Sequence, residues 1–127
     1  MPIALAIAAC GDAARVPADV ARQLPTQEYG LSQDLCPRDV GIGPEYGAQR
    51  LRRNQRKGKR ELDALERAYR DDPDAIVRAT YTPADEPGIA HEDISIRELA
   101  ETQLKGFDVL DGECSRRAAA RLRALLG

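Results

Sequence analysis

The chain offers few residues that could carry out acid–base or metal chemistry. It contains one histidine, His91, which is followed directly by Glu92 and Asp93. Catalysis needs groups that converge on one reacting atom, and neither a second histidine nor a Gly-x-Ser-x-Gly or Walker motif accompanies these three. Three adjacent residues rarely point at one ion, and no Cys/His spacing supports zinc. We therefore expect a solvated polar loop at His91, and a protein that is not an enzyme and uses no metal or cofactor.

The main charged feature is the segment 50–60, in which seven of eleven residues are basic and none is acidic. A run of this kind can bind anionic lipid headgroups, envelope polymers or nucleic-acid phosphates, and it is also typical of a solvated helix face. It lacks the interleaved aromatic residues that stack on bases, so nucleic acid is the less favoured partner. The basic residues are Arg50, Arg52, Arg53, Arg56, Lys57, Lys59 and Arg60.

The N-terminus places a cysteine after a short apolar run. Residues 3–9 are far fewer than the roughly 20 that a membrane-spanning helix requires. The run ends in Ile7-Ala8-Ala9-Cys10, which resembles the lipobox of bacterial lipoproteins. The resemblance implies cleavage before Cys10, lipid attachment to its thiol and a position in the cell envelope. Residues 1–9 would be a signal peptide, one that looks truncated because no basic residue precedes the apolar run.

The lipoprotein resemblance also bears on the other two cysteines. With Cys10 lipidated, Cys36 and Cys114 remain as an even pair in a compartment that permits disulfides. A bridge across so long a loop contributes roughly 4.5 kcal/mol in the chain-entropy model. In a reduced cytosol, the same two residues would be ordinary buried thiols.

Two segments before residue 83 carry helix or strand patterns. Residues 45–70 combine strong helix formers with apolar residues three and four positions apart, which predicts a helix that Gly58 kinks or divides. The β-branched stretch 75–82 suits a strand or a helical turn. Between residues 10 and 44, repeated Pro and Gly predict a tether with one short helix near 18–23.

Two further helices are predicted in the last third of the chain. Ser95 and Glu98 form a capping box at the start of the first, and Gly106 is placed to end it. The second covers 113–126 and carries Cys114 on its apolar stripe, so this cysteine is expected to face the core.

Together these patterns predict a mainly α protein with about three helices and a short β element. The expected organisation is a signal peptide at 1–9, an irregular tether over 10–44 and a small helical domain over 45–127. The expected role is that of a non-catalytic, lipid-anchored envelope protein, a binding or structural module at the membrane surface with an unknown protein partner. The alternative is a cytosolic helical protein that binds nucleic acid or another polyanion through 50–60.

Overall fold

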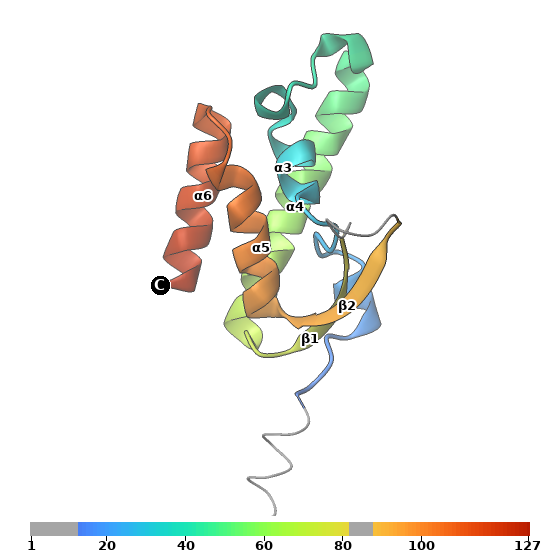
Figure 1. The fold of residues 1–127 in the computed structure, drawn as a ribbon, viewed down its shortest axis with the longest axis vertical. Helices are drawn as coiled ribbons and strands as arrows, with labels where there is room; N and C mark the ends of the chain where they lie inside the picture. Colours follow the sequence, from blue (N-terminus) through green and yellow to red (C-terminus); the bar gives the residue numbers. More distant parts are fainter. Residues whose placement is uncertain (1–12, 82–87) are drawn as a thin grey trace, which may run out of the picture.

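The computed structural model describes residues 13–81 and 88–127, which form three longer helices, two short ones, two 3-10 turns and a two-stranded sheet (Figure 1). The predicted mainly α class with a short β element is confirmed. In chain order the elements are α2 (Ala18–Ala21), α3 (Gly30–Leu35), η1 (Pro37–Val40), η2 (Pro44–Tyr46), α4 (Ala48–Asp71), β1 (Ile76–Tyr81), β2 (Ala90–Ser95), α5 (Ile96–Asp108) and α6 (Glu113–Leu126).

Helix α4 is continuous through Gly58, so the alternative of two separate helices is wrong. Gly58 is buried because α3 crosses α4 closely at this point. A Cβ atom at Gly58 would lie 3.0 Å from the backbone nitrogen of Leu35 and 3.1 Å from its Cα. The glycine therefore permits close helix–helix contact. Among the described residues no helix, α4 included, combines the length and the apolar character needed to cross a membrane.

The stretch that suited either strand or helix is the strand β1. Its side chains alternate, with Val77 and Ala79 buried and Arg78 exposed between them, as expected for a strand with one face on the core. It pairs antiparallel with β2, in the register Ile76↔Ser95 to Tyr81↔Ala90. The β2 sequence Ala-His-Glu-Asp-Ile-Ser has little intrinsic strand preference, and pairing with β1 determines its conformation.

The expected tether over 10–44 differs from the structure, because its described part belongs to the fold. Leu24 and Leu31 are buried in the same core as α4 and α5. The backbone around Arg15 also bonds to β1: Ile76 N–H donates to Ala14 O at 2.8 Å, and Val16 N–H donates to Ile76 O at 2.9 Å. Pro and Gly exclude long periodic elements here, but they permit short helices whose apolar residues reach the core.

A buried glutamine on α5 fixes this N-terminal segment. The Gln103 side chain donates from Nε2 to the carbonyl oxygens of Pro25 and Gln27, each at 2.9 Å. Its Oε1 accepts the N–H of Leu31 at 3.2 Å. One amide group thus bonds to three backbone groups: it is the partner of Pro25 O and Leu31 N–H, and it adds a second hydrogen bond to Gln27 O, which also accepts the N–H of Gly30 at 3.0 Å.

Helix α5 begins as predicted and ends later than predicted. Ser95 Oγ accepts the N–H of Glu98 at 3.0 Å, which is the expected cap. Gly106 lies inside the helix and does not end it. A glycine suits this position because Tyr29 packs so closely that a Cβ atom would be 2.9 Å from the ring carbon Cδ1. Helix α6 has the predicted extent and lies beside α5 (Figure 1).

Candidate functional site

The basic residues of 50–60 lie on the first half of α4, whose N-terminal end extends beyond α3 and α6 (Figure 1) and whose later turns pack against α3. At about 100° per residue, they fall in two neighbouring rows that cover about half of the helix circumference. One row holds Arg50, Arg53, Lys57 and Arg60, and the other holds Arg52, Arg56 and Lys59. All seven side chains are exposed. We call this surface the basic arc; the other half of the helix circumference carries the side that faces α3 and the core.

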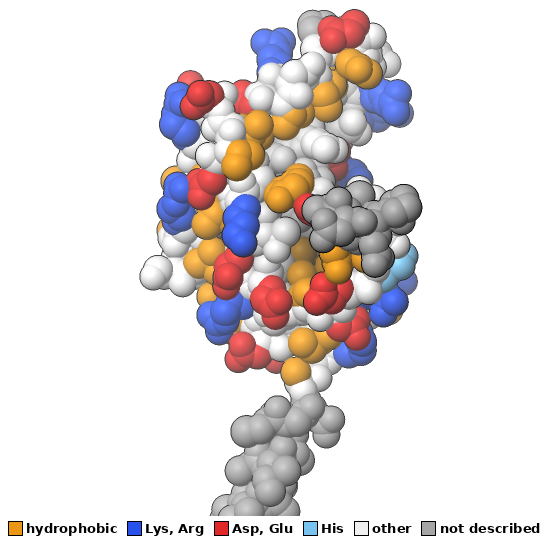
Figure 2. Space-filling view, viewed as in Figure 1, with side chains coloured by type: hydrophobic (Ala, Val, Ile, Leu, Met, Phe, Trp, Pro, Cys, Tyr) orange, Lys and Arg blue, Asp and Glu red, His pale blue; other side chains and the backbone are white. Residues whose placement is uncertain are grey.

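The basic arc has little internal neutralisation. Within residues 13–81 and 88–127, Lys57 is the only member that forms an ion pair within 4.0 Å, with Asp34 of α3 at 3.5 Å. Lys57 and Arg60 also interact electrostatically with Glu61. The second half of α4 is different, because Arg121 of α6 bonds to Asp63 at 3.0 Å and to Glu66. Figure 2 shows Lys and Arg side chains on both sides of the projecting upper part of the molecule.

Charge is therefore distributed unevenly along the chain. Without the seven residues of the basic arc, 12 basic residues remain against the 21 acidic ones. The formal charge of −2 is the near-cancellation of a strongly positive half-helix and a clearly negative remainder. Whole-chain charge conceals this separation, which concentrates positive charge on the first half of α4.

A carboxyl group lies beneath the basic arc on the α3 side. Burial raises the pKa of Glu61 above its usual value; Lys57 opposes the rise, and the Asp34 carboxylate adds to it. The Oε1 atom of Glu61 is buried and has no hydrogen-bond partner in the described part of the chain. Ionised Glu61 is consequently a destabilising element at the junction of α3 and α4.

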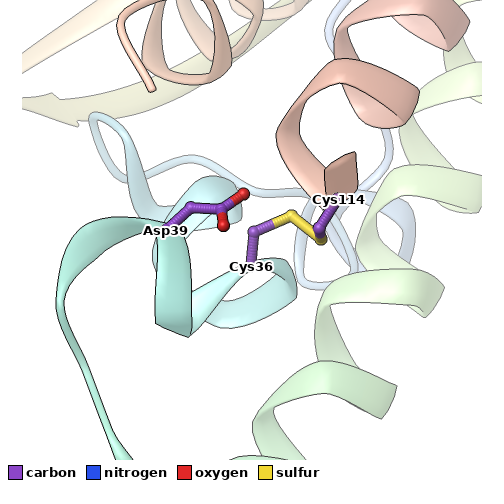
Figure 3. A group of neighbouring side chains, drawn as sticks. All are labelled: Cys36, Asp39 and Cys114. Carbon is purple, nitrogen blue, oxygen red and sulfur yellow. A yellow bond between two sulfur atoms is a disulfide. The ribbon is translucent and has the colours of Figure 1, made fainter. Parts of the chain in front are cut away.

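The predicted cysteine pair is present as a disulfide between Cys36 and Cys114, with a Cα–Cα distance of 5.7 Å (Figure 3). Cys36 is buried at the end of α3, and Cys114 lies in the first turn of α6. The bridge thus joins the segment that contacts the basic half of α4 to the last helix of the chain.

Asp39 reinforces this junction. Its carboxylate accepts the backbone N–H of Ser115 at 3.1 Å and the Ser115 hydroxyl at 2.5 Å, and so caps α6 from a distant segment. Gly112 makes the approach possible, since a Cβ atom there would overlap the Asp39 carboxylate. The cap is not predictable from the sequence, because no local motif links residues 76 positions apart.

The sulfur atoms of Cys36 and Cys114 and a carboxylate oxygen of Asp39 all lie within 4.8 Å of one another. Such a group could suggest a metal site, but thiolates are the metal ligands and both sulfurs are bonded to each other. The Asp39 carboxylate is also engaged by Ser115. The arrangement acts chemically as a covalent clamp with a helix cap.

His91, Glu92 and Asp93 lie on strand β2, so the expected loop is wrong for these residues. Antiparallel pairing with β1 extends the chain here. Adjacent strand side chains point to opposite faces, which separates Glu92 from the other two. Asp93 forms an ion pair with Arg15 and lies 3.7 Å from Arg78, so its carboxylate helps to hold the N-terminal segment on the sheet.

A pocket of about 330 Å³ with a mixed polar and apolar lining lies between the sheet, α5 and the segment 26–28. Glu92, Glu98 and Thr102 are among its lining residues, and Gln103 forms part of its wall. Glu98 is already used in the cap of α5, where Ser95 Oγ lies 3.3 Å from its Oε1. Two of the pocket's polar lining residues, Glu98 and Gln103, are therefore already engaged in structural hydrogen bonds.

Cys10 and residues 1–9 lie outside the described residues. Ala14 follows Cys10 by four residues and is bonded to β1, so the chain between them spans at most about 14 Å. The first described residues lie at the end of the molecule opposite the start of α4 (Figure 1).

Comparison with known proteins finds no matching family model, and no curated protein or solved structure with significant similarity.

Proposed function

We propose that this protein is a lipid-anchored component of a bacterial cell envelope, in which a disulfide-closed helical domain acts as a non-catalytic binding module. The observation that carries the proposal is the Cys36–Cys114 disulfide. It accounts for two of the three cysteines and leaves Cys10, in its lipobox-like context, as the remaining thiol. Disulfides persist in oxidising compartments, which favours export over the cytosolic alternative.

The position of Cys10 supports an anchor with a short reach. Because the fold begins within about 14 Å of Cys10, the lipid would hold the domain next to the membrane rather than on a long tether. Two or three acyl chains give stable attachment, whereas a single chain anchors only marginally.

Intact mass spectrometry of protein from its native cells, prepared without reductant, tests the proposal. The expected mass is that of a chain beginning at Cys10, with two or three acyl groups and two hydrogens fewer than the dithiol. Cys10→Ser should abolish the acyl mass, and a Cys36→Ser/Cys114→Ser double variant should keep it. An unmodified full-length chain would refute the anchor and favour the cytosolic polyanion-binding alternative.

A further inference from the structure

We propose that the basic arc is a docking surface for a linear, non-nucleic-acid polyanion of the envelope, such as a glycopolymer with a phosphate or carboxylate in each repeat. The proposal rests on the proposed function for its location, since the anchor determines which polyanions are within reach. The binding chemistry itself belongs to the arc and can be measured on the unlipidated chain.

The charge pattern of the arc favours an anionic partner. Members of a row are three or four residues apart, so their charges repeat about every 5 Å along the helix. Arg52 and Arg56, and likewise Arg53 and Lys57, are like-charged pairs at i,i+4, which repel each other. In the described ranges only Lys57 forms an ion pair within 4.0 Å, and Glu61 is the other carboxyl that acts on the arc, through Lys57 and Arg60. A bound polyanion would relieve this repulsion and release its own counterions.

The shape of the arc favours a chain over a flat surface. Its two rows are separated by about 100° around the axis, as Arg52 and Arg53 illustrate. A plane tangent to the helix midway between the rows lies about 50° from each, so side chains of both rows must bend toward it. A flexible polymer can instead curve around the helix and meet each row directly. The N-terminal end of α4 leaves room for this, because it extends beyond α3 and α6 (Figure 1).

The place of the arc also separates it from the membrane that holds Cys10. Along α4 alone, Arg60 lies about 16 Å and Arg50 about 32 Å from Asp71, at the end of the helix nearest β1. Headgroup fields fade over a Debye length of about 8 Å at physiological salt. With the domain attached through residues 11–13, the arc faces the space above the headgroups.

Binding of long-chain inorganic polyphosphate to the full chain carrying Cys10→Ser, in oxidised form, tests the surface. If five of the seven basic residues contact phosphates, the affinity for polyphosphate should fall about 100-fold between 50 and 200 mM salt. In the triple variant R52Q/R53Q/R56Q the same change of salt should lower the affinity only about 7-fold, because three contacts are lost. The matched control R67Q/R70Q/R116Q removes the same charge from exposed sites outside the arc and should bind like the parent.

Two other probes separate the alternatives. Equal loss in both triple variants would show that only net charge matters and would overturn the proposal. The proposal would also be overturned if vesicles with 30% anionic lipid bound the arc with higher affinity than polyphosphate does. Binding of single-stranded DNA of equal charge with tenfold higher affinity than polyphosphate would overturn it as well. Failure of lipidation at Cys10 would refute the anchor while leaving arc-dependent polyphosphate binding intact, so the two failures are distinguishable.

Discussion

The two halves of α4 have the same backbone conformation and different physical roles. In the first half, 48–60, Gly58 is the only buried residue, and of the seven basic residues only Lys57 forms an ion pair within 4.0 Å. The second half, 61–71, buries Leu62, Ala64 and Leu65, and Arg121 neutralises two of its carboxylates. One helix therefore joins a core element to an exposed, positively charged element.

The largest expected effect concerns the bridge behind the first half of α4. Replacing Cys36 and Cys114 by alanine should lower the free energy of unfolding by up to roughly 4.5 kcal/mol, because the unfolded chain regains its freedom. Denaturant unfolding of oxidised, reduced and double-variant protein measures this. The double variant should be insensitive to dithiothreitol, and equal stability of all three forms would contradict a structural bridge.

A matched pair of leucines compares the two halves directly. Leu65→Ala should lower the free energy of unfolding by about 2–5 kcal/mol, because the side chain is fully buried and its removal leaves a cavity. Leu51→Ala should cost about 1 kcal/mol or less, since Leu51 is only half-buried. Urea midpoints give both values. Equal costs would mean that the first half is as firmly packed as the second.

Gly58 is the contact that holds the first half of α4 against α3. Gly58→Ala gains about 1 kcal/mol of helix propensity and loses about 2 kcal/mol to overpacking, a net loss of about 1 kcal/mol. The overpacking penalty exceeds the gain in helix propensity because the nearest atoms belong to the Leu35 backbone, which cannot move by a change of rotamer. Hydrogen exchange should accelerate in 48–57 more than in 61–71. Lys59→Ala, at an exposed neighbour, provides the control.

Single charge deletions should give smaller effects of opposite sign. Arg121→Gln should cost about 0.5 kcal/mol by releasing Asp63 and Glu66, which are partly exposed partners. Arg53→Gln should be neutral or stabilise by about 0.3 kcal/mol, because it relieves repulsion from Lys57 four residues on. Thermal melts at low salt compare the two. A destabilised Arg53→Gln would point to an acidic partner for this residue.

The smallest effect is a pH dependence at Glu61. A carboxyl whose folded pKa is raised contributes stability below its unfolded pKa, near 4.5, and loses it as pH rises through the folded value. Glu61→Gln should therefore become increasingly more stable than the parent as pH rises from 4.5 toward neutrality. Unfolding at a series of pH values tests this, with the exposed Glu101→Gln as a control for net charge.

Local patterns predicted the extent of α6, the cap of α5 and most of α4, because helix formers, apolar spacing and Ser95 act within a few residues. Helix α4 begins at Ala48, three residues later than predicted, because Pro44–Tyr46 form a separate 3-10 turn.

Local patterns failed where distant parts meet. Gly58 and Gly106 were interpreted as breaks, although both are sites where another segment packs against a helix. The core role of residues 13–36 depends on Gln103, and nothing in the local sequence signals that contact.

The candidate site divides in the same way. The residues of the basic arc could be listed from the sequence, since charge and helical spacing are local properties. Their separation from acidic partners depends on the placement of Asp63 and Glu66 toward Arg121, which only the packed fold defines. The cap from Asp39 to Ser115 is likewise a product of three-dimensional proximity.

The attachment of the first described residues to β1, and of Cys36 to α6, has a consequence for biosynthesis. The contact between Ala14 and Ile76 can form once the first three fifths of the chain have been made. The Cys36–Cys114 bridge can form only after nearly all of the chain has been made, because Cys114 lies in the last helix. A newly made chain therefore acquires its N-terminal contact with β1 before its covalent closure.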